Sequence, residues 1–499
     1  MSFPHALYRA ADVRELDRRA IGNGIPANEL MRRAGVALFD ALRERFPAAG
    51  RMLVLCGGGN NGGDGYVLAR LARDFGLDVT LCALTDPAAL KGAAREAHAA
   101  WIGAGGACTA FTADALRDTD VVIDALLGTG LDRAVEGDMA AVIRAVNAAV
   151  KPVIAADIPS GLHADTGAVP GLAIRATLTV SFIGLKAGLF TGRGPAFAGE
   201  VRFAGLDVPA DVYRDVPPLA ERLDAGLLQG WLPPRERDAH KGSFGHVVIL
   251  GGGAGMPGAA RMAGEAALRA GAGKASVLAW PGNVAAIAGG RPELMCRGVD
   301  SGEDCESTLR RASVLAAGPG LGQDAWSENL WNHLRHRDNA NLPRVIDADG
   351  LNWLARHPLP LTANDVITPH PGEAARLLDC PVNRVEANRF AAARRLAEKF
   401  GCVAVLKGAG TLIAAPDGRL RVCDAGNPGM ASGGMGDVLT GVIAALRAQG
   451  LAAFDAACAG VQVHAIAGDR AARRGERGLL ASEVLAEIRG VVNPGARGA

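Results

Sequence analysis

The stretch LCGGGNNGGDG, residues 55–65, is the most informative segment in the first half of the chain. It follows the apolar run 52–56 and precedes a helical pattern that starts at Tyr66, so we predict a strand, a glycine-rich loop and a helix. Backbone N–H groups in such a loop, at the positive end of a helix, can bind the phosphates of a nucleotide. The loop is not a GxGxxG motif, because its asparagines and aspartate add side-chain oxygens that a phosphate turn does not require. We expect it to bind a phosphate-bearing ligand that also has polar groups.

Short apolar runs surround this unit and alternate with helical patterns. Two helices are expected within residues 12–46, and further strands at 79–84, 121–127, 153–156 and 178–182. Strands that are apolar without alternation are typical of a parallel sheet covered by helices on both faces. The first half is therefore predicted to be a three-layer α/β/α domain.

The second half repeats this rhythm. The segment 208–234, which holds five prolines, is the predicted domain boundary, with a helix expected near residues 219–228. After it we expect a strand at 247–250, a glycine loop at 251–258, a helix at 259–270, and strands at 314–317, 345–347, 366–368, 403–406 and 412–415. The prediction is two three-layer α/β domains.

The composition restricts the class of protein. The 499 residues carry 53 Lys and Arg against 52 Asp and Glu, a net charge of +1, which argues against a nucleic-acid binder or a polybasic membrane binder. No uncharged apolar run reaches about 18 residues, and the charged N-terminal segment does not fit a signal peptide. The nine cysteines are scattered without a CxxC pair, which favours free thiols in a reducing cytoplasm.

Glycine is the most unusual part of the composition. The chain has 67 glycines, and many lie at 57–65, 128–130, 251–258, 318–322, 408–410 and 426–436. These are predicted turns at strand ends, where glycine lets the backbone approach a ligand. The excess indicates binding loops rather than a flexible linker.

Two carboxylates end neighbouring strands of the first domain. Asp124 is followed by GTGLDR, residues 128–133, and Asp157 is followed by IPSG, residues 158–161. In open α/β sheets, ligands bind beyond the carboxyl ends of the strands. One such aspartate is often only a helix cap, but two of them beside an asparagine-rich loop indicate a polar site.

NNGGDG, GTGLDR, ADIPSGL at 156–162 and ADTG at 164–167 resemble the NAD(P)HX epimerase family over residues 1–215. The resemblance implies a Rossmann-like domain that interconverts the R and S forms of hydrated NADH or NADPH. It implies a potassium ion held by Asn60, Asp124 and Ser160, whose oxygens suit a hard cation. Asp157 is the candidate acid or base. The residues implied to contact the hydrate are Asn61, Gly62, Gly63, Asp64, Gly128, Thr129, Gly130, Leu131, Asp132, Arg133, Ala134 and Asp157.

The second domain has its strongest motif near its end. DAGNPGMASGGMGD, residues 424–437, runs into the apolar stretch 438–446, so Asp437 is expected in the first turn of a helix. Glycines at a helix N-terminus form an anion-binding site, and an aspartate there can deprotonate a hydroxyl that attacks phosphorus. A favourable helix-dipole interaction alone would not need the preceding glycines.

Further candidates lie earlier in this domain. LKGAGT, residues 406–411, places Lys407 among small residues, which suits phosphate or adenylate contacts, with a solvated strand-end lysine as the alternative. TPHPGE, residues 368–373, places His370 between two prolines, so a ligand-facing loop is favoured over a core histidine. Asp347 and Asp349 suit either magnesium or a helix cap.

These motifs, with GGAGMPGA at 252–259 and GPGLG at 318–322, resemble the ribokinase-like superfamily and, within it, the NAD(P)HX dehydratases over residues 222–495. The resemblance implies that the S hydrate is dehydrated with Mg²⁺ and ADP, the nucleotide of the bacterial-type enzymes. The implied hydrate contacts are Ala259, Gly320, Gly322, His370 and Asp437, and the implied nucleotide contacts are Lys407, Gly408, Ala409, Gly410, Thr411 and Gly436.

Both motif sets in one chain predict a bifunctional enzyme that repairs hydrated nicotinamide nucleotides. Phosphorylation of the hydrate hydroxyl turns a poor leaving group into a good one, and loss of phosphate restores the dihydropyridine. Two alternatives stay open: a ribokinase-like vitamin-precursor kinase with an accessory first domain, and a first domain that only binds a ligand. The expected partners are NADHX, NADPHX and ADP, with no nucleic acid and no membrane, in a cytoplasmic homo-oligomer.

Overall fold

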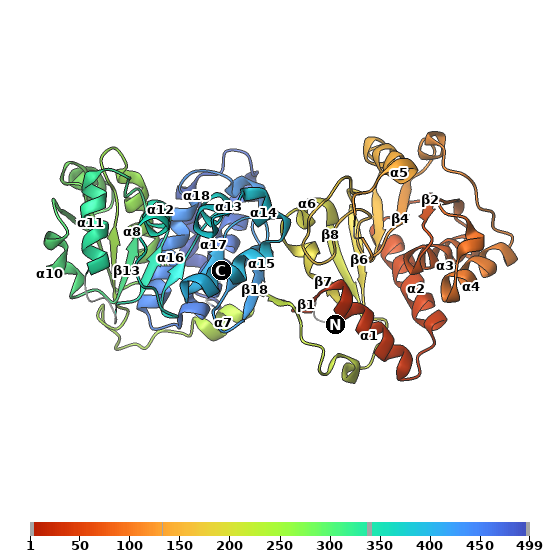
Figure 1. Cartoon of the computed structure of the whole chain (residues 1–499), viewed down its shortest axis with the longest axis horizontal. Helices are drawn as coiled ribbons and strands as arrows, with labels where there is room; N and C mark the ends of the chain where they lie inside the picture. The colour runs from red at the N-terminus through yellow and green to blue at the C-terminus, as the bar shows by residue number, and fades with distance from the viewer. Residues whose placement is uncertain (1–3, 132, 337–341, 496–499) are drawn as a thin grey trace. The chain divides into compact units, whose positions relative to one another are not determined.

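The computed structural model describes residues 4–131, 133–336 and 342–495. The chain forms two compact units, Met1–Glu221 and Arg222–Ala499 (Figure 1). Each unit contains a mainly parallel sheet with helices against it, so the predicted α/β class is confirmed. Among the residues that the structure describes, no helix is long and apolar enough to cross a bilayer.

The sheet of the first unit is parallel throughout. Its strand order is β3-β2-β4-β5-β6-β8. A small second ladder joins β1 in parallel to β7 and antiparallel to β9. The strands are β1 (Ala6–Tyr8), β2 (Arg51–Cys56), β3 (Asp78–Ala83), β4 (Val121–Ala125), β5 (Val153–Ala156), β6 (Leu178–Phe182), β7 (Leu185–Lys186), β8 (Glu200–Ala204) and β9 (Ala220–Arg222).

Helices cover both faces of this sheet. Side chains alternate along β2, so that Val54 and Cys56 share a core with α3 while Leu53 and Leu55 share a core with α5. This alternation makes the unit three-layered, as expected. Its helices are α1 (Ala10–Gly22), α2 (Ala27–Arg45), α3 (Asn60–Asp74), α4 (Gly92–Gly103), α5 (Gly137–Ala148) and α6 (Gly194–Ala198).

The start of α3 differs from the prediction. The helix begins at Asn60 rather than at Tyr66, so all of NNGGDG is helical. A Cβ on Gly62 would lie 2.1 Å from the carbonyl oxygen of Gly57, and a Cβ on Gly65 would lie 2.8 Å from the Cβ of Ala125. The close approach of the helix to the strand ends therefore requires glycine, and this packing overrides its low helix propensity.

The sheet of the second unit includes the order β12-β11-β10-β13-β14-β15-β16-β17-β18. Neighbours are parallel from β12 to β16, whereas β16, β17 and β18 are antiparallel. The strands are β10 (His246–Leu250), β11 (Lys274–Ala279), β12 (Met295–Gly298), β13 (Val314–Ala317), β14 (Arg344–Ile346), β15 (Val366–Ile367), β16 (Val403–Leu406), β17 (Thr411–Ala414) and β18 (Leu420–Cys423).

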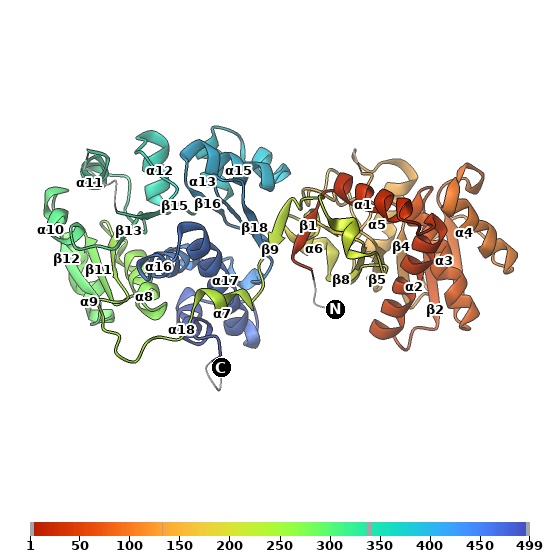
Figure 2. The ribbon, with the colours of Figure 1, turned by 90° about the horizontal axis from the view of Figure 1, so that it is seen from below.

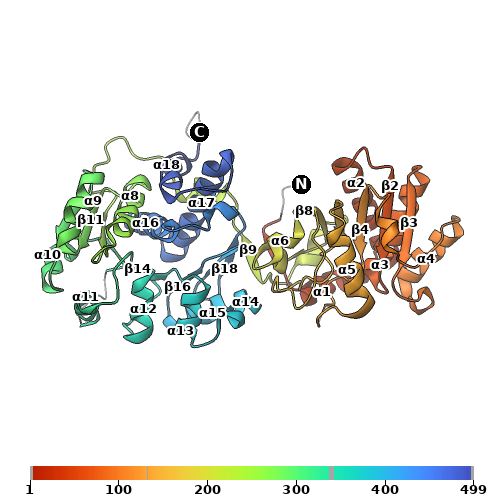
Figure 3. The same ribbon diagram turned by 90° about the horizontal axis from the view of Figure 1, so that it is seen from above.

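Two helical layers enclose this sheet. Helices α8, α16, α17 and α18 lie on one face, and α11, α12, α13 and α15 lie on the other (Figure 2), an arrangement that Figure 3 also shows. The helices are α7 (Leu227–Trp231), α8 (Pro257–Arg269), α9 (Val284–Gly290), α10 (Glu306–Leu309), α11 (Ala325–His336), α12 (Asp349–Arg356), α13 (Pro371–Leu378), α14 (Val382–Ala387), α15 (Arg389–Phe400), α16 (Met435–Ala448), α17 (Ala453–Ala471) and α18 (Ala481–Val491).

One predicted helix is wrong. The segment 219–228 was expected to be helical, but residues 220–222 form strand β9 and the short helix α7 begins only at Leu227. Strand β9 exists because it pairs with β1, more than 200 positions earlier in the chain. A local pattern cannot report such a distant partner.

Candidate functional site

The first unit has a cavity at the carboxyl ends of its strands, where open α/β sheets bind ligands. Its volume is about 1340 Å³. Two of the residues predicted to contact the hydrate, Gly62 and Gly63, do not line this cavity and pack against Gly57 and Met31. Asp132 lies outside the described residues. The predicted residues that line the cavity are Asn60, Asn61, Asp64, Gly128, Thr129, Gly130, Leu131, Arg133, Ala134 and Asp157.

Asn61 and Asp64 reach this cavity from the first turns of α3, and each is only 8% exposed. The side-chain amide of Asn61 has no hydrogen-bond partner in the described part of the chain. An unpaired buried polar group costs about 1–3 kcal/mol. A ligand that pairs with this amide would remove that cost.

Asp157 follows β5 and has a left-handed backbone with φ of 66°. Its carboxylate accepts a hydrogen bond from the N–H of Phe182 at 3.0 Å and forms an ion pair with the ammonium of Lys186. Lys186 is fully buried and also donates to the carbonyl oxygen of Phe182 at 2.9 Å. Lys186 was not predicted, because its partner lies 29 residues away, although a lysine inside the apolar stretch 178–190 was a usable signal.

Three further carboxyls line the cavity, those of Asp64, Asp17 and Glu136. Burial raises the pKa of Asp64 well above its usual range, Asp157 and Asp17 add to this shift, and Lys186 opposes it. Burial also raises the pKa of Asp17 to about 6. Asp17 was not predicted, because in the sequence it looks like any solvent-facing charge of an amphipathic helix. Burial thus acts against the charged form of both Asp64 and Asp17.

Asp124 and Ser160, two of the predicted potassium ligands, lie in contact and are fully buried. Ser160 donates to Asp124 twice, from its hydroxyl at 2.6 Å and from its N–H at 2.8 Å. Burial nevertheless raises the pKa of Asp124 to about 6. Asn60, the third predicted ligand, is exposed at the start of α3, and no hydrogen bond from it to the other two is found among the described residues. A buried carboxylate beside further oxygen donors suits a monovalent cation.

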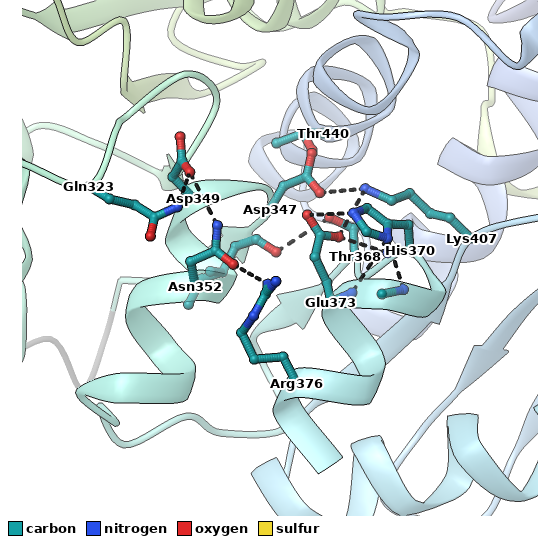
Figure 4. A network of polar contacts seen from close by, with 12 residues as sticks. Gln323, Asp347, Asp349, Asn352, Thr368, His370, Glu373, Arg376, Lys407 and Thr440 are labelled. Carbon is teal, nitrogen blue, oxygen red and sulfur yellow. Dashed lines mark hydrogen bonds and ion pairs between the residues drawn. The ribbon is translucent and has the colours of Figure 1, made fainter. Parts of the chain in front are cut away.

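The second unit has a polar cluster at the carboxyl ends of β14, β15 and β16 (Figure 4). Asp347 accepts hydrogen bonds from the ammonium of Lys407 at 2.6 Å and from the hydroxyl of Thr440 at 2.9 Å. Burial alone would raise the pKa of Asp347, but Lys407 and the hydrogen bonds outweigh it, so the pKa is lowered. Burial acts against the ammonium of Lys407, yet Asp347 and Glu373 raise its pKa. Lys407 is thus fixed inside the site and is not a solvated strand-end lysine.

His370 and Glu373 cap the N-terminus of α13. The Nδ1 atom of His370 accepts from the N–H groups of Gly372 at 3.0 Å and Glu373 at 3.4 Å, and Glu373 accepts from the N–H of His370 at 2.8 Å. Because Nδ1 is an acceptor, the neutral ring carries its proton on Nε2. Burial lowers the pKa of His370, with the charge of Lys407 adding to it. The ring is 56% exposed, and its Nε2 atom lies 3.4 Å from a carboxylate oxygen of Glu373.

Glu373 was not singled out from the sequence. Burial raises its pKa to about 7, and Lys407, with its ammonium 3.8 Å from the carboxylate, opposes the shift. Figure 4 shows Glu373 between His370 and Arg376 and directed toward Lys407. The motif HPGE contained the signal, but its capping role and its partner Lys407 emerge only in the folded chain.

Helix α16 starts after Gly434, whose φ of 88° requires glycine. Asp437 is in the first turn, as predicted, and burial raises its pKa to about 7, with Asp347 adding to the shift and Lys407 opposing it. A Cβ on Gly436 would lie 3.3 Å from both the Asp347 carboxylate and the Lys407 ammonium. The helix N-terminus, the lysine and the raised-pKa carboxyl therefore share one site.

Ala259, at the start of α8, lies beside the loop that holds Gly320 and Gly322. A Cβ on Gly320 would be 3.0 Å from the Cβ of Ala259, and the N–H of Gly322 donates to Asp349 at 2.9 Å. Asp349 also accepts from the side chains of Gln323 and Asn352, each at 3.2 Å (Figure 4). The charge of Asp349 contributes to the raised pKa of Asp437. These loops therefore border the α16 site.

The turn 407–411 is held by a buried arginine. Arg389 is 1% exposed and donates to the carbonyl oxygens of Leu406 at 3.3 Å and Lys407 at 3.0 Å. Gly408 has φ of 137°, and its Cβ would lie 2.9 Å from the Arg389 guanidinium. The hydroxyl of Thr411 closes the turn by donating to the Gly408 carbonyl at 3.0 Å. Arg389 was not predicted, because it lies 18 residues before the turn that it supports.

An aspartate in the first turn of a helix that glycines precede, beside a fixed lysine, is the arrangement of an enzyme that transfers phosphoryl groups to a hydroxyl. Known proteins agree with this class. Residues 247–489 match the family model described as NAD(P)H-hydrate dehydratase, and residues 27–188 match that of the YjeF-related protein N-terminus. A ribokinase-like superfamily protein from Enterococcus faecalis covers 54% of this chain and 94% of its own, with TM-score 0.50 and 29% identity.

Full-length relatives are closer in sequence. The bifunctional NAD(P)H-hydrate repair enzyme of Coxiella burnetii is 46% identical over 98% of this chain and 99% of its own length. That of Escherichia coli is 46% identical over 99% of this chain and 95% of its own length. The chain belongs to the family of bifunctional NAD(P)H-hydrate repair enzymes, and the resemblance drawn from the motifs is confirmed.

Proposed function

We propose that this protein repairs hydrated NADH and NADPH at two sites. The first unit interconverts the R and S hydrates, and the second dehydrates the S hydrate with ADP, releasing AMP and phosphate. The observation that carries the proposal is that each unit assembles its motifs into one polar site at the strand ends. We assign the epimerase domain to residues 1–215 and the dehydratase domain to residues 222–495.

In the epimerase, the cavity wall binds the hydrate, and the carboxylate of Asp157 takes up and returns the proton of the hydrate hydroxyl. The unpartnered amide of Asn61 supports a polar contact to the ligand. The loop 128–134 follows β4 and lines the same cavity at its described residues. Asp157 is anchored by Lys186 and Phe182, which fixes its carboxylate at the end of β5. A proton acceptor at a fixed position is what general base catalysis requires.

In the dehydratase, Asp437 takes the proton of the hydrate hydroxyl while the oxygen attacks the terminal phosphorus of ADP. The N–H groups at the start of α16 and the ammonium of Lys407 stabilise the transferred phosphoryl group. AMP leaves, and the bond between carbon six and oxygen then breaks with phosphate as the leaving group. Loss of a proton from carbon five completes the dihydropyridine. The exposed ring of His370 supports a contact to the hydrate, and the turn 407–411, which Arg389 holds, supports a contact to the nucleotide.

Two cations fit the side chains present. A potassium ion would be held by Asp124 and Ser160, with Asn60 as a further oxygen donor, and would neutralise a buried carboxylate. Magnesium would neutralise the phosphates of ADP. Asp347 and Asp349 are its candidate ligands. The oxygens of Asp347 are engaged by Lys407 and Thr440, and those of Asp349 by Gly322, Gln323 and Asn352. We further propose a cytoplasmic homo-oligomer that acts on NADHX and NADPHX without nucleic acid or membrane partners.

A coupled assay tests the proposal. The protein is incubated with mixed R and S NADHX, ADP, magnesium and potassium, and the dihydropyridine absorbance is followed. Complete recovery is expected, because epimerisation feeds the S form to the dehydratase. If recovery of the absorbance stops at the initial fraction of S hydrate, the protein has only the dehydratase activity. Absence of recovery together with phosphorylation of a vitamin precursor would contradict the proposal and favour the kinase alternative.

A further inference from the structure

Epimerisation at carbon six requires a second proton carrier beside Asp157. This carbon bears both the hydroxyl and the ring nitrogen, so opening the ring takes a proton from oxygen and delivers one to nitrogen. A single carboxylate that accepts the first proton cannot at the same moment donate the second. The carrier must be an acid that lines the same cavity and is not already an anion in an ion pair.

Asp157 has the surroundings of an anion. Its carboxylate accepts the Phe182 N–H at 3.0 Å and is paired with the Lys186 ammonium. Lys186 is fully buried, and its second acceptor is the Phe182 carbonyl at 2.9 Å. Contacts of this kind favour the charged form of a carboxyl.

Asp64 has the opposite surroundings. It lines the cavity from α3 at 8% exposure, and no hydrogen bond or ion pair reaches its carboxyl among the residues described. The groups that face it are Asp17 of α1, Asp157, Lys186 and Cys56 of β2. Lys186 is the single cation of this described set, and it is engaged by Asp157. Arg14, Arg133 and Glu136 lie elsewhere on the cavity wall.

We infer that Asp64 is the general acid of the epimerase and that Asp157 is its general base. This inference rests on the proposed function of the first unit. Asp157 accepts the hydroxyl proton, the O–H electron pair forms the C=O bond, and the bond between carbon six and nitrogen breaks. Its electron pair takes the proton of Asp64. Rotation about the bond between carbons five and six presents the other carbonyl face, and the reverse steps return both protons. Two carboxyls whose environments separate their protonation states are a recurring acid–base pair.

Three variants of the full chain test the assignment on separated R and S hydrates. Asp64→Asn should lower kcat for R/S equilibration about 10²–10⁴-fold, because the acid is lost, with KM much less affected. In the unmodified protein, kcat/KM should fall at alkaline pH as the acid ionises. This alkaline fall should be absent from the residual activity of Asp64→Asn. Asp64→Glu should restore part of the rate and the alkaline fall. Asp17→Asn, the matched control at a second, half-buried carboxyl of the cavity, should keep the alkaline fall.

Dehydration of the S hydrate by the Asp64→Asn protein should stay at the wild-type rate, which shows that the second unit is folded, and the first unit should unfold at the wild-type temperature, which shows that it is folded too. Wild-type equilibration by Asp64→Asn, or loss of the alkaline fall in Asp17→Asn alone, would overturn the inference. Failure of the unmodified protein to equilibrate R and S would instead refute the proposed function. Hydrate labelled with ¹⁸O at carbon six should keep its label through inversion, and exchange with water at every inversion would overturn the ring-opening step.

Discussion

Asp437 should make the rate of the proposed dehydration dependent on pH. Burial raises its pKa to about 7, and the proposed base must be ionised to accept the hydroxyl proton. We therefore expect kcat/KM for dehydration to rise tenfold per pH unit below about pH 7 and to level off above it. Asp437→Asn should lower kcat by about 10²–10⁴-fold and abolish this rise. A pH profile of the unmodified protein that is flat between pH 5 and 8 would contradict the role of Asp437.

Asp124 should link the first unit to potassium. Its buried carboxylate has a pKa raised to about 6, and a bound cation would lower this pKa by favouring the ionised form. Asp124→Asn removes the charge but keeps the shape. We expect R/S equilibration by the unmodified protein to depend on potassium concentration and the variant to lose this dependence and most of its rate. Equal stimulation of both proteins by potassium would place the cation elsewhere.

Single residues were predictable where they belong to a short motif. Asp437 and Asp157 stand at strand ends or helix starts that the pattern of apolar runs already marks. Lys186, Glu373 and Arg389 were missed because each acts through a partner that only folding brings near. A buried charge is recognisable in a sequence mainly when its surroundings are apolar for several residues on both sides, which holds for Lys186 alone among the three.

Among the elements, the first turns of α3 are the tightest. Gly62→Ala would push a methyl group to 2.1 Å from the Gly57 carbonyl oxygen. We expect the first unit to lose about 1–3 kcal/mol of unfolding free energy and most of its epimerase activity, while dehydration of the S hydrate is unchanged. Gly22→Ala, at the end of α1 where the added methyl meets nothing within 4 Å, is the control and should change little. Equal thermal stability of both variants would contradict this account of α3.

Arg389 should control nucleotide affinity through the turn 407–411. Arg389→Met removes the hydrogen bonds to the Leu406 and Lys407 carbonyls. We expect the KM for ADP to rise roughly 10- to 100-fold, which corresponds to a lost charged hydrogen bond, with a smaller change in kcat. Arg389→Lys should restore part of the affinity. Arg395→Met, at an exposed position of the same helix, is the control and should leave the KM unchanged. A fall in kcat at constant KM would argue against a positioning role.

The predicted strands formed where apolar residues run without interruption. Strands β5, β6, β13 and β16 begin and end at the predicted residues. Strands β1, β7, β9 and β12 were missed because each is short and depends on a neighbour distant in sequence. Strands β8 and β11 were missed as well, because polar residues interrupt their apolar patterns. The antiparallel hairpin of β17 and β18 was half predicted, since only the segment near β17 carries an uninterrupted apolar pattern. Local hydrophobicity therefore predicts most central strands, with β11 as an exception, and long-range pairing decides most edge strands.

For the whole molecule, the two activities should be separable. Each unit buries its own cores, and the proposed catalytic groups of each lie within it. The Asp437→Ala protein should equilibrate the R and S hydrates without restoring NADH. With the Asp157→Asn protein, recovery of NADH should stop at the initial fraction of S hydrate. A mixture of the two proteins should reach complete conversion, because the released S hydrate diffuses between molecules. A mixture that also stops at the S fraction would show that the intermediate does not leave the chain in which it forms.

The left-handed backbone of Asp157 restricts how this position can change over evolutionary time. Asparagine and glycine accept such a φ at low cost, whereas β-branched residues are strained there. Both tolerated replacements are one base away from an aspartate codon, and neither can carry the proton. The shortest mutational routes out of Asp157 that keep the backbone unstrained therefore abolish the chemistry and leave the cavity. A single base change can therefore produce a descendant of this domain that keeps the cavity but lacks the proton-transferring carboxylate.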